Sequence, residues 1–174
     1  MKAGIVICLG DMVKEKFGQQ KWDAALEGAG LNKNAMFIPI QDVADETIIK
    51  VVHSACKVLN LTIEQATDAF GDYWVNTYAP KIYRTYFRGA NSAKDFLLQM
   101  DRVHEAVTTN IPNAKPPRFS YEWTNDKTLL MKYKSNRGMI DILVGCAKGV
   151  GKYFNEEVRV RKLSTDKIEV VFAR

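Results

Sequence analysis

The sequence predicts an α+β protein in which a helical N-terminal part is followed by an antiparallel sheet. Three observations support this class. Apolar residues recur at helical spacing through most of residues 1–109, and short alternating runs separated by turn residues follow residues 116–117. The 174 residues are 47% hydrophobic and 26% charged, which is enough apolar material for a packed core.

The first half of the chain is predicted to form helices, with glycine, acidic residues and proline marking their ends. Apolar positions in residues 5–17 share one helical face, and we expect Gly18 to end this helix. Residues 22–29 predict a second, short helix. Acidic residues at 42, 45 and 46 precede a third over residues 47–59, because carboxylates favour a helix N-terminus. A fourth begins at residues 62–68 and extends to Pro80, which we expect to interrupt it.

A further helix is predicted from about residue 92 to residue 109, ending before Pro112. Beyond it, residues 119–123 and 129–134 form a predicted hairpin around the turn-like residues 124–126. Residues 139–154 return to helical spacing, and residues 158–163 and 168–172 form a second hairpin around residues 164–166. We expect one domain over residues 1–174.

Charge, cysteine content and hydropathy limit which classes of function the sequence allows. The formal net charge is +5, from 25 Lys and Arg against 20 Asp and Glu, but the charges are interspersed, so nucleic-acid binding is a weak interpretation. Cys8, Cys56 and Cys146 are widely spaced, which argues against a disulfide framework or a zinc site and favours a reducing cytoplasm. The apolar stretch at residues 3–9 is too short to span a bilayer, so neither export nor membrane insertion is expected.

His104 is the first candidate for chemistry. It shares a helix face with Phe96, Met100, Val103 and Val107, which aims its imidazole into an apolar interior. A core histidine satisfied by a hydrogen bond and an axial haem ligand both fit this pattern. His104 alone does not decide between them, and the only other histidine, His53, has a weaker claim.

Tyr133, Ser135 and Arg137 are the second candidate. On a strand, alternate residues project from one face, so two hydroxyls and a guanidinium would converge on an anion with two carboxylates. Ordinary solvent-facing polar residues on a sheet would give the same pattern.

Taken together, these features resemble the haem nitric oxide/oxygen binding family, H-NOX, which includes the sensor domain of soluble guanylate cyclase. The residues that carry the resemblance are His104 in MDRVHEAV, Pro116 and Pro117 in AKPPRF, and the YxSxR motif at 133–137. The opening residues 5–18 and FGDYW at 70–74 are also similar. The likeness covers nearly the whole chain.

The resemblance implies the cofactor and its site. The cofactor is haem b, iron protoporphyrin IX, lying between a distal helical part, residues 1–60, and a proximal α/β part, residues 61–174. His104 is the iron ligand, and Tyr133, Ser135 and Arg137 hold the propionates. The residues implied to line the distal side of the haem are Ile5, Leu9, Trp74, Ile142 and Cys146. Pro117 and Ile5 press on and distort the macrocycle.

The distal residues bear on which gas binds. By the resemblance, oxygen-binding members place a tyrosine where this chain has Ile142, so the donor that would stabilise bound oxygen is missing. Nitric oxide binds ferrous iron without such a donor and is the expected ligand, with carbon monoxide also accepted. The Trp74 indole, or Tyr73 if the register differs by one, stays open as a donor. Cys146 lies among small apolar residues and is expected to be inert.

The resemblance also implies a signal, in which nitric oxide breaks the bond between iron and His104 and lets the haem relax. An enzyme is not expected, since the chain has no Gly-rich phosphate loop, no HExxH and no nucleophile elbow. An oxygen sensor and a haem-free adaptor domain stay as alternatives. The implied partner is a separate output protein, a histidine kinase or a cyclic-di-GMP enzyme.

Overall fold

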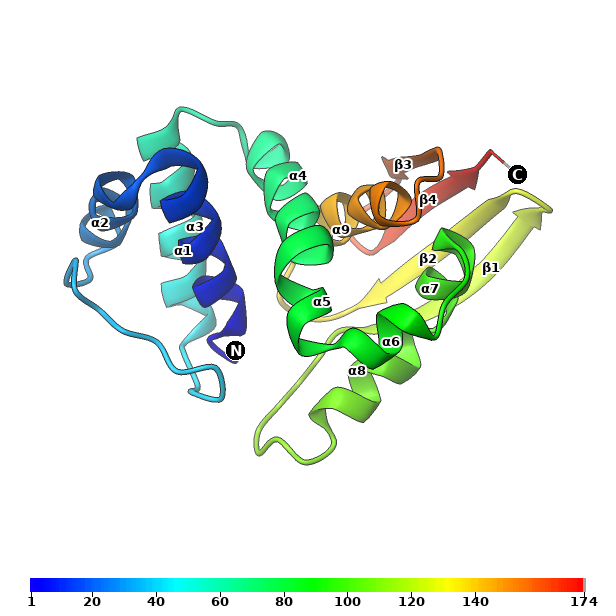
Figure 1. Cartoon of the computed structure of the whole chain (residues 1–174), viewed down its shortest axis with the longest axis horizontal. Coiled ribbons are helices and arrows are strands. Elements are labelled where there is room, and N and C mark those ends of the chain that lie inside the picture. The colour runs from blue at the N-terminus through cyan, green and yellow to red at the C-terminus, as the bar shows by residue number, and fades with distance from the viewer. Residues whose placement is uncertain (174) are drawn as a thin grey trace. The chain divides into compact units, whose positions relative to one another are not determined.

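A computed structural model describes residues 1–173 (Figure 1). The chain forms two compact units. One contains Met1–Ala66 and Pro112–Ala114, and the other contains Thr67–Ile111 and the chain from Lys115 onward.

The first unit is a small helical bundle. Its helices are α1 (Gly4–Phe17), α2 (Gln19–Gly28) and α3 (Asp45–Leu59), which agree with the predicted helices to within three residues. Gly10 lets α2 approach α1, because a Cβ atom at this position would lie 2.9 Å from the Trp22 ring. Asn60 ends α3 in the left-handed conformation, at φ 53°.

The prediction that Pro80 interrupts the fourth helix is wrong. Helix α4 (Ile63–Tyr73) continues into a π-helical turn, η1 (Trp74–Tyr78), and then into α5 (Ala79–Ile82), which contains Pro80 in its first turn. The Ala79 N–H donates to the Trp74 carbonyl across the wider turn. Proline is tolerated in the first turn of a helix, where its missing N–H is not needed.

The single helix predicted over residues 92–109 is also divided. After the short α6 (Arg84–Arg88), helix α7 (Ala93–Leu98) is capped by the Ser92 hydroxyl, which accepts from the Asp95 N–H at 3.0 Å. Gln99 separates it from α8 (Met100–Thr108). The break lets Phe96 and Leu97 pack into the core, while α8 turns to contact strand β1 of the sheet.

The predicted antiparallel sheet is confirmed. Strands β1 (Arg118–Asn125), β2 (Thr128–Lys134), β4 (Lys167–Phe172) and β3 (Val158–Lys162) pair in the order β1-β2-β4-β3 (Figure 1). The first turn is shorter than predicted, because Thr124 and Asn125 belong to β1. Alternate strand residues bury one face of the sheet, namely Leu129, Met131, Tyr133, Ile168, Val170 and Phe172.

Helix α9 (Ile140–Tyr153) connects the two hairpins and packs against both β3 and α4. A Cβ atom at Gly145 would overlap the Thr67 carbonyl, and one at Gly149 would lie 2.8 Å from the Gly71 oxygen, so only glycine permits this approach. Lys148 pairs with Asp68 at 2.7 Å across the same contact. The contact fixes the helix that carries Ile142 and Cys146.

None of the helices in residues 1–173 is both long enough and apolar enough to cross a bilayer.

Candidate functional site

His104 lies near the middle of α8 and faces the start of β1. Its Nδ1 atom is 3.1 Å from the carbonyl oxygen of Pro117. Because a carbonyl can only accept a hydrogen bond, Nδ1 carries the proton and donates, and Nε2 is left with its lone pair. Burial lowers the pKa of His104 below its ordinary value, which favours the neutral imidazole that binds metals.

Aromatic rings connect His104 to the YxSxR motif. The His104 and Phe119 ring centroids are 5.1 Å apart, and Phe119 lies 6.2 Å from the ring of Tyr133. Phe119 and Tyr133 are paired across β1 and β2, and both are buried. The histidine therefore lies at one end of an apolar, aromatic wall.

Strand β2 ends at Lys134, so the expectation that the whole YxSxR motif lies on a strand is wrong. Only Tyr133 is in the strand. Ser135 follows it, and its hydroxyl accepts from the Arg137 N–H at 3.3 Å in a turn that Gly138 completes at φ 65°. A side-chain oxygen that satisfies the backbone two residues ahead favours a turn over a continued strand.

Arg137 nevertheless returns toward the His104 region. Its Nη1 atom donates to the carbonyl of Lys115, two residues before the carbonyl that His104 contacts. The short segment 115–117 is therefore bonded from both sides, by the turn after β2 and by α8. Pro116 and Pro117 stiffen this segment, because proline fixes φ.

Asp101, one turn before His104, forms the tightest polar cluster near the histidine. Its carboxylate accepts from Arg118 Nε at 2.8 Å and Nη2 at 2.7 Å, and from the Phe119 N–H at 2.7 Å. Hydrogen bonds from Arg118 lower the pKa of Asp101 to about 2, so it is ionised. The Asp101 N–H donates to the Tyr121 hydroxyl at 3.1 Å, which satisfies an amide of the first turn of α8.

The predicted distal residues lie on several elements. Trp74 is in the π-helical turn, between the rings of Phe70 at 5.9 Å and Tyr78 at 5.3 Å, measured between centroids. Ile142 and Cys146 are half-buried on α9, one turn apart, and burial raises the pKa of Cys146 to about 12.

Ile5 and Leu9 belong to α1 of the first unit, where Leu9 is buried and Ile5 is half-buried.

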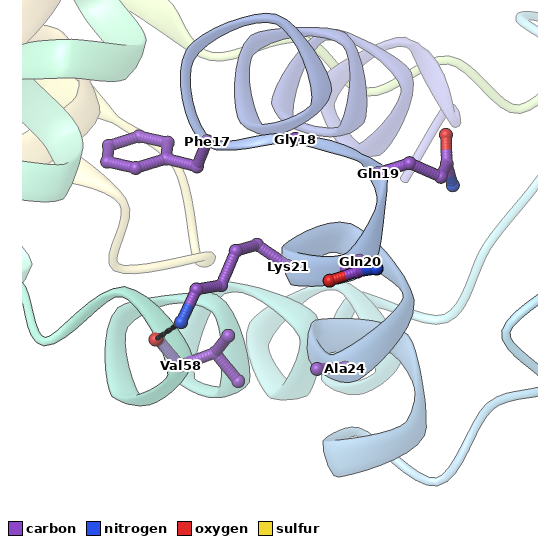
Figure 2. Close-up of a pocket in the computed structure, with 7 residues that line it drawn as sticks. All are labelled: Phe17, Gly18, Gln19, Gln20, Lys21, Ala24 and Val58. Atoms are coloured by element: carbon purple, nitrogen blue, oxygen red, sulfur yellow. Dashed lines mark hydrogen bonds between the residues drawn. The ribbon is translucent and has the colours of Figure 1, made fainter.

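A separate hollow of about 550 Å³ lies in the first unit, at the junction of α1 and α2 (Figure 2). Phe17, Lys21 and Val58 contribute to its lining, and the Lys21 ammonium donates to the Val58 carbonyl at 3.5 Å. None of the predicted site residues lines it.

The residues of the second unit fit a haem. A neutral imidazole with a free Nε2 can bind iron, an aromatic wall suits a macrocycle, and Ser135 and Arg137 are donors of the kind that bind carboxylates. This fit rests on the chemistry of the side chains.

The family comparison decides the identity. The family model described as Haem-NO-binding matches residues 2–162. The chain belongs to this family. It is a haem-binding H-NOX gas-sensor domain and not a catalytic one, as the sequence predicted.

The curated relatives are longer proteins. Soluble guanylate cyclases gcy-32 and gcy-34 of Caenorhabditis elegans are each 28% identical, over 81% and 84% of this chain. The chain spans only 21% and 22% of their lengths.

Solved structures confirm the H-NOX fold. A Cs H-NOX variant with 4-cyano-L-phenylalanine at site 5 matches with a TM-score of 0.89 and 23% identity, covering 100% of this chain and 97% of the other. An oxygen-binding H-NOX domain in its oxygen complex matches with a TM-score of 0.84 and 23% identity, covering 100% and 96%.

Sequence reasoning missed Asp101, Arg118 and Phe119. The one available signal was an acidic residue one turn before the histidine and a basic residue directly after the Pro-Pro pair. Their 17-residue separation hid the ion pair until the fold joined them.

Proposed function

We propose that this H-NOX domain senses nitric oxide through ferrous haem b, with His104 as the residue that would bind the iron. The observation that carries the proposal is the bond between His104 Nδ1 and the Pro117 carbonyl at 3.1 Å, which leaves Nε2 free to bind iron. Bound ferrous haem supplies an open coordination position for a diatomic gas.

The protein's own residues hold and tune the cofactor. His104 binds the iron from α8, and the Tyr133 hydroxyl, Ser135 and Arg137 are proposed to hold the propionates. Arg137 is suited to this role because a guanidinium can bind a carboxylate through two parallel hydrogen bonds. Pro117, in the stiff segment that His104 contacts, is proposed to press on the macrocycle.

Ligand choice is proposed to depend on the distal side. Ile5, Leu9, Ile142 and Cys146 offer no strong hydrogen-bond donor, since the Cys146 thiol is a weak one. Nitric oxide, and carbon monoxide as a second ligand, bind ferrous iron without that help, whereas oxygen gains strongly from it. The Trp74 indole N–H is the one strong donor among the proposed distal residues.

The signal is proposed to be the release of His104. Without a bond from His104 to the cofactor, α8 would lose a tether, and the equilibrium between two conformations would shift. The output module is proposed to act in a reducing cytoplasm and to be a histidine kinase or a cyclic-di-GMP enzyme. The guanylate cyclase relatives add a cyclase as a third candidate.

The test is the absorption spectrum of the ferrous protein with and without nitric oxide, and in air. We expect a Soret band that shifts with nitric oxide and stays that of unligated haem in air, apart from slow oxidation. A stable oxygen complex would refute the ligand assignment in favour of an oxygen sensor. A colourless protein after haem reconstitution would favour a haem-free adaptor.

The variant His104→Gly tests the ligand itself. We expect it to lose haem or to need added imidazole, whereas the matched control His53→Gly keeps the wild-type spectrum, because His53 is exposed on α3. Unchanged coordination in His104→Gly would show that another residue binds the iron.

A further inference from the structure

The start of β1 is attached to α8 through three consecutive residues. The Pro117 carbonyl accepts from His104 Nδ1 at 3.1 Å, the Arg118 guanidinium donates twice to Asp101, and the Phe119 N–H donates to Asp101 at 2.7 Å. Two of these three attachments depend on one carboxylate. Asp101 therefore fixes the position of the backbone at residues 117–119.

Asp101 holds the backbone that directly follows the Pro117 carbonyl. The side chain of Asp101 is 27% exposed, and two of its three contacts are a bidentate pair with Arg118, the strongest form of ion pair between side chains. The third contact fixes the amide of Phe119, only two residues beyond the Pro117 carbonyl. A shift of that amide moves the carbonyl relative to the imidazole.

The same contacts keep the Asp101 carboxylate from serving as the hydrogen-bond acceptor of His104. Asp101 and His104 are three residues apart on one helix, a spacing at which side chains are neighbours. The Asp101 oxygens accept hydrogen bonds from Arg118 and from the Phe119 N–H. The His104 imidazole donates instead to the neutral carbonyl of Pro117. A carbonyl raises the basicity of an imidazole less than a carboxylate does.

We infer that Asp101, oriented by Arg118, is a positioning residue that holds the Pro117 carbonyl on His104 Nδ1 and thereby sets the strength of His104 as an iron ligand. This inference rests on the proposed role of His104.

The first test needs no haem. Long-range ¹H–¹⁵N spectra of the apo protein report which ring nitrogen of His104 carries the proton. We expect the Nδ1–H form in the wild type and a shift toward the Nε2–H form in Asp101→Ala, because the carbonyl no longer fixes the tautomer. A purely structural role for Asp101 would lower the unfolding midpoint without changing the tautomer.

The second test uses the ferrous haem protein. We expect Asp101→Ala to bind haem about tenfold more weakly, the lower end of the loss usual for such outer partners. The iron–histidine stretching frequency in resonance Raman spectra is expected to fall, because the imidazole loses its acceptor.

Glu105→Gln is the matched control. Glu105 lies on the same helix as Asp101 and accepts from the same Arg118 guanidinium at 3.3 Å. Its side chain is 60% exposed, and the bond to the Phe119 backbone N–H belongs to Asp101 instead. We expect the wild-type tautomer, the wild-type stretching frequency and haem affinity within about twofold of the wild type.

The outcomes separate the two proposals. An unchanged tautomer and stretching frequency in folded Asp101→Ala, or equal changes in Glu105→Gln, would overturn the positioning role. If Asp101→Ala does not fold, Asp101→Asn is expected to shift both readouts part of the way, and no shift would overturn the role. Failure of the wild type to bind haem would refute the proposed function while leaving the tautomer result interpretable.

Discussion

The contact between α4 and α9 gives the sharpest prediction about stability. Gly145→Ala adds one methyl group where the Thr67 carbonyl already lies, and Gly71 opposes the same point from α4. Backbone atoms cannot rotate away as a side chain can. The two helices must separate, which strains the Lys148–Asp68 pair at 2.7 Å.

The magnitude follows from two opposing effects. Alanine is favoured over glycine within a helix by about 1 kcal/mol. Overpacking a tight contact costs up to about 3 kcal/mol, and the upper end applies because the overlap is with backbone. We therefore expect Gly145→Ala to lower the free energy of unfolding by about 2 kcal/mol, or the Tm by about 4–8 °C.

The assay is urea and thermal unfolding followed by far-ultraviolet circular dichroism. Gly4→Ala is the control, because a Cβ atom at Gly4 meets nothing within 4 Å, and its stability is expected to be unchanged or slightly higher. If Gly145→Ala unfolds within about 0.5 kcal/mol of the wild type, the close approach does not exist and the steric reasoning is wrong.

Three further predictions concern single side chains. The folded-state pKa of Asp101, about 2, is below its ordinary value of 3.8, so its stabilisation is present above pH 4 and lost as pH falls toward 2. The full shift corresponds to about 2.4 kcal/mol, solvent screening of this partly exposed carboxylate makes the loss smaller, and acid titration of Asp101→Asn should lack it. Asn76→Ala removes the Nδ2 bond to the Gly149 carbonyl at 3.1 Å and should cost about 1 kcal/mol in urea unfolding; no loss would show that water replaces it. Burial raises the pKa of the half-buried Cys146 thiol to about 12, so this thiol should react slowly with thiol reagents at pH 8, and rapid labelling of the native protein would contradict the raised pKa.

Local patterns predicted most helices and strands because each needs only near neighbours. The helical periodicity of residues 5–17 and the alternation of residues 168–172 report which face is buried. The helix predictions around Pro80 and Gln99 were wrong. The first is accommodated by a π-helical turn and the second divides a continuous pattern, and both depend on packing elsewhere in the chain.

The candidate site was predictable only in part. The placement of His104 beside apolar residues and the spacing of YxSxR are visible in the printed sequence. That Ser135 and Arg137 leave the strand was not, because the Ser135 hydroxyl stabilises a turn through a weak local bond that periodicity does not register.

The sequence by itself determined the class of fold, the family and the identity of the candidate iron ligand, since these depend on residue types and their spacing. Only the tertiary structure decided which atom of His104 is free, which carboxylate orients the strand beside it, and how closely α9 approaches α4. The physical reason is that hydrogen bonds and steric contacts act over a few ångströms. Residues 13 to 80 positions apart are brought within that range only when the chain folds.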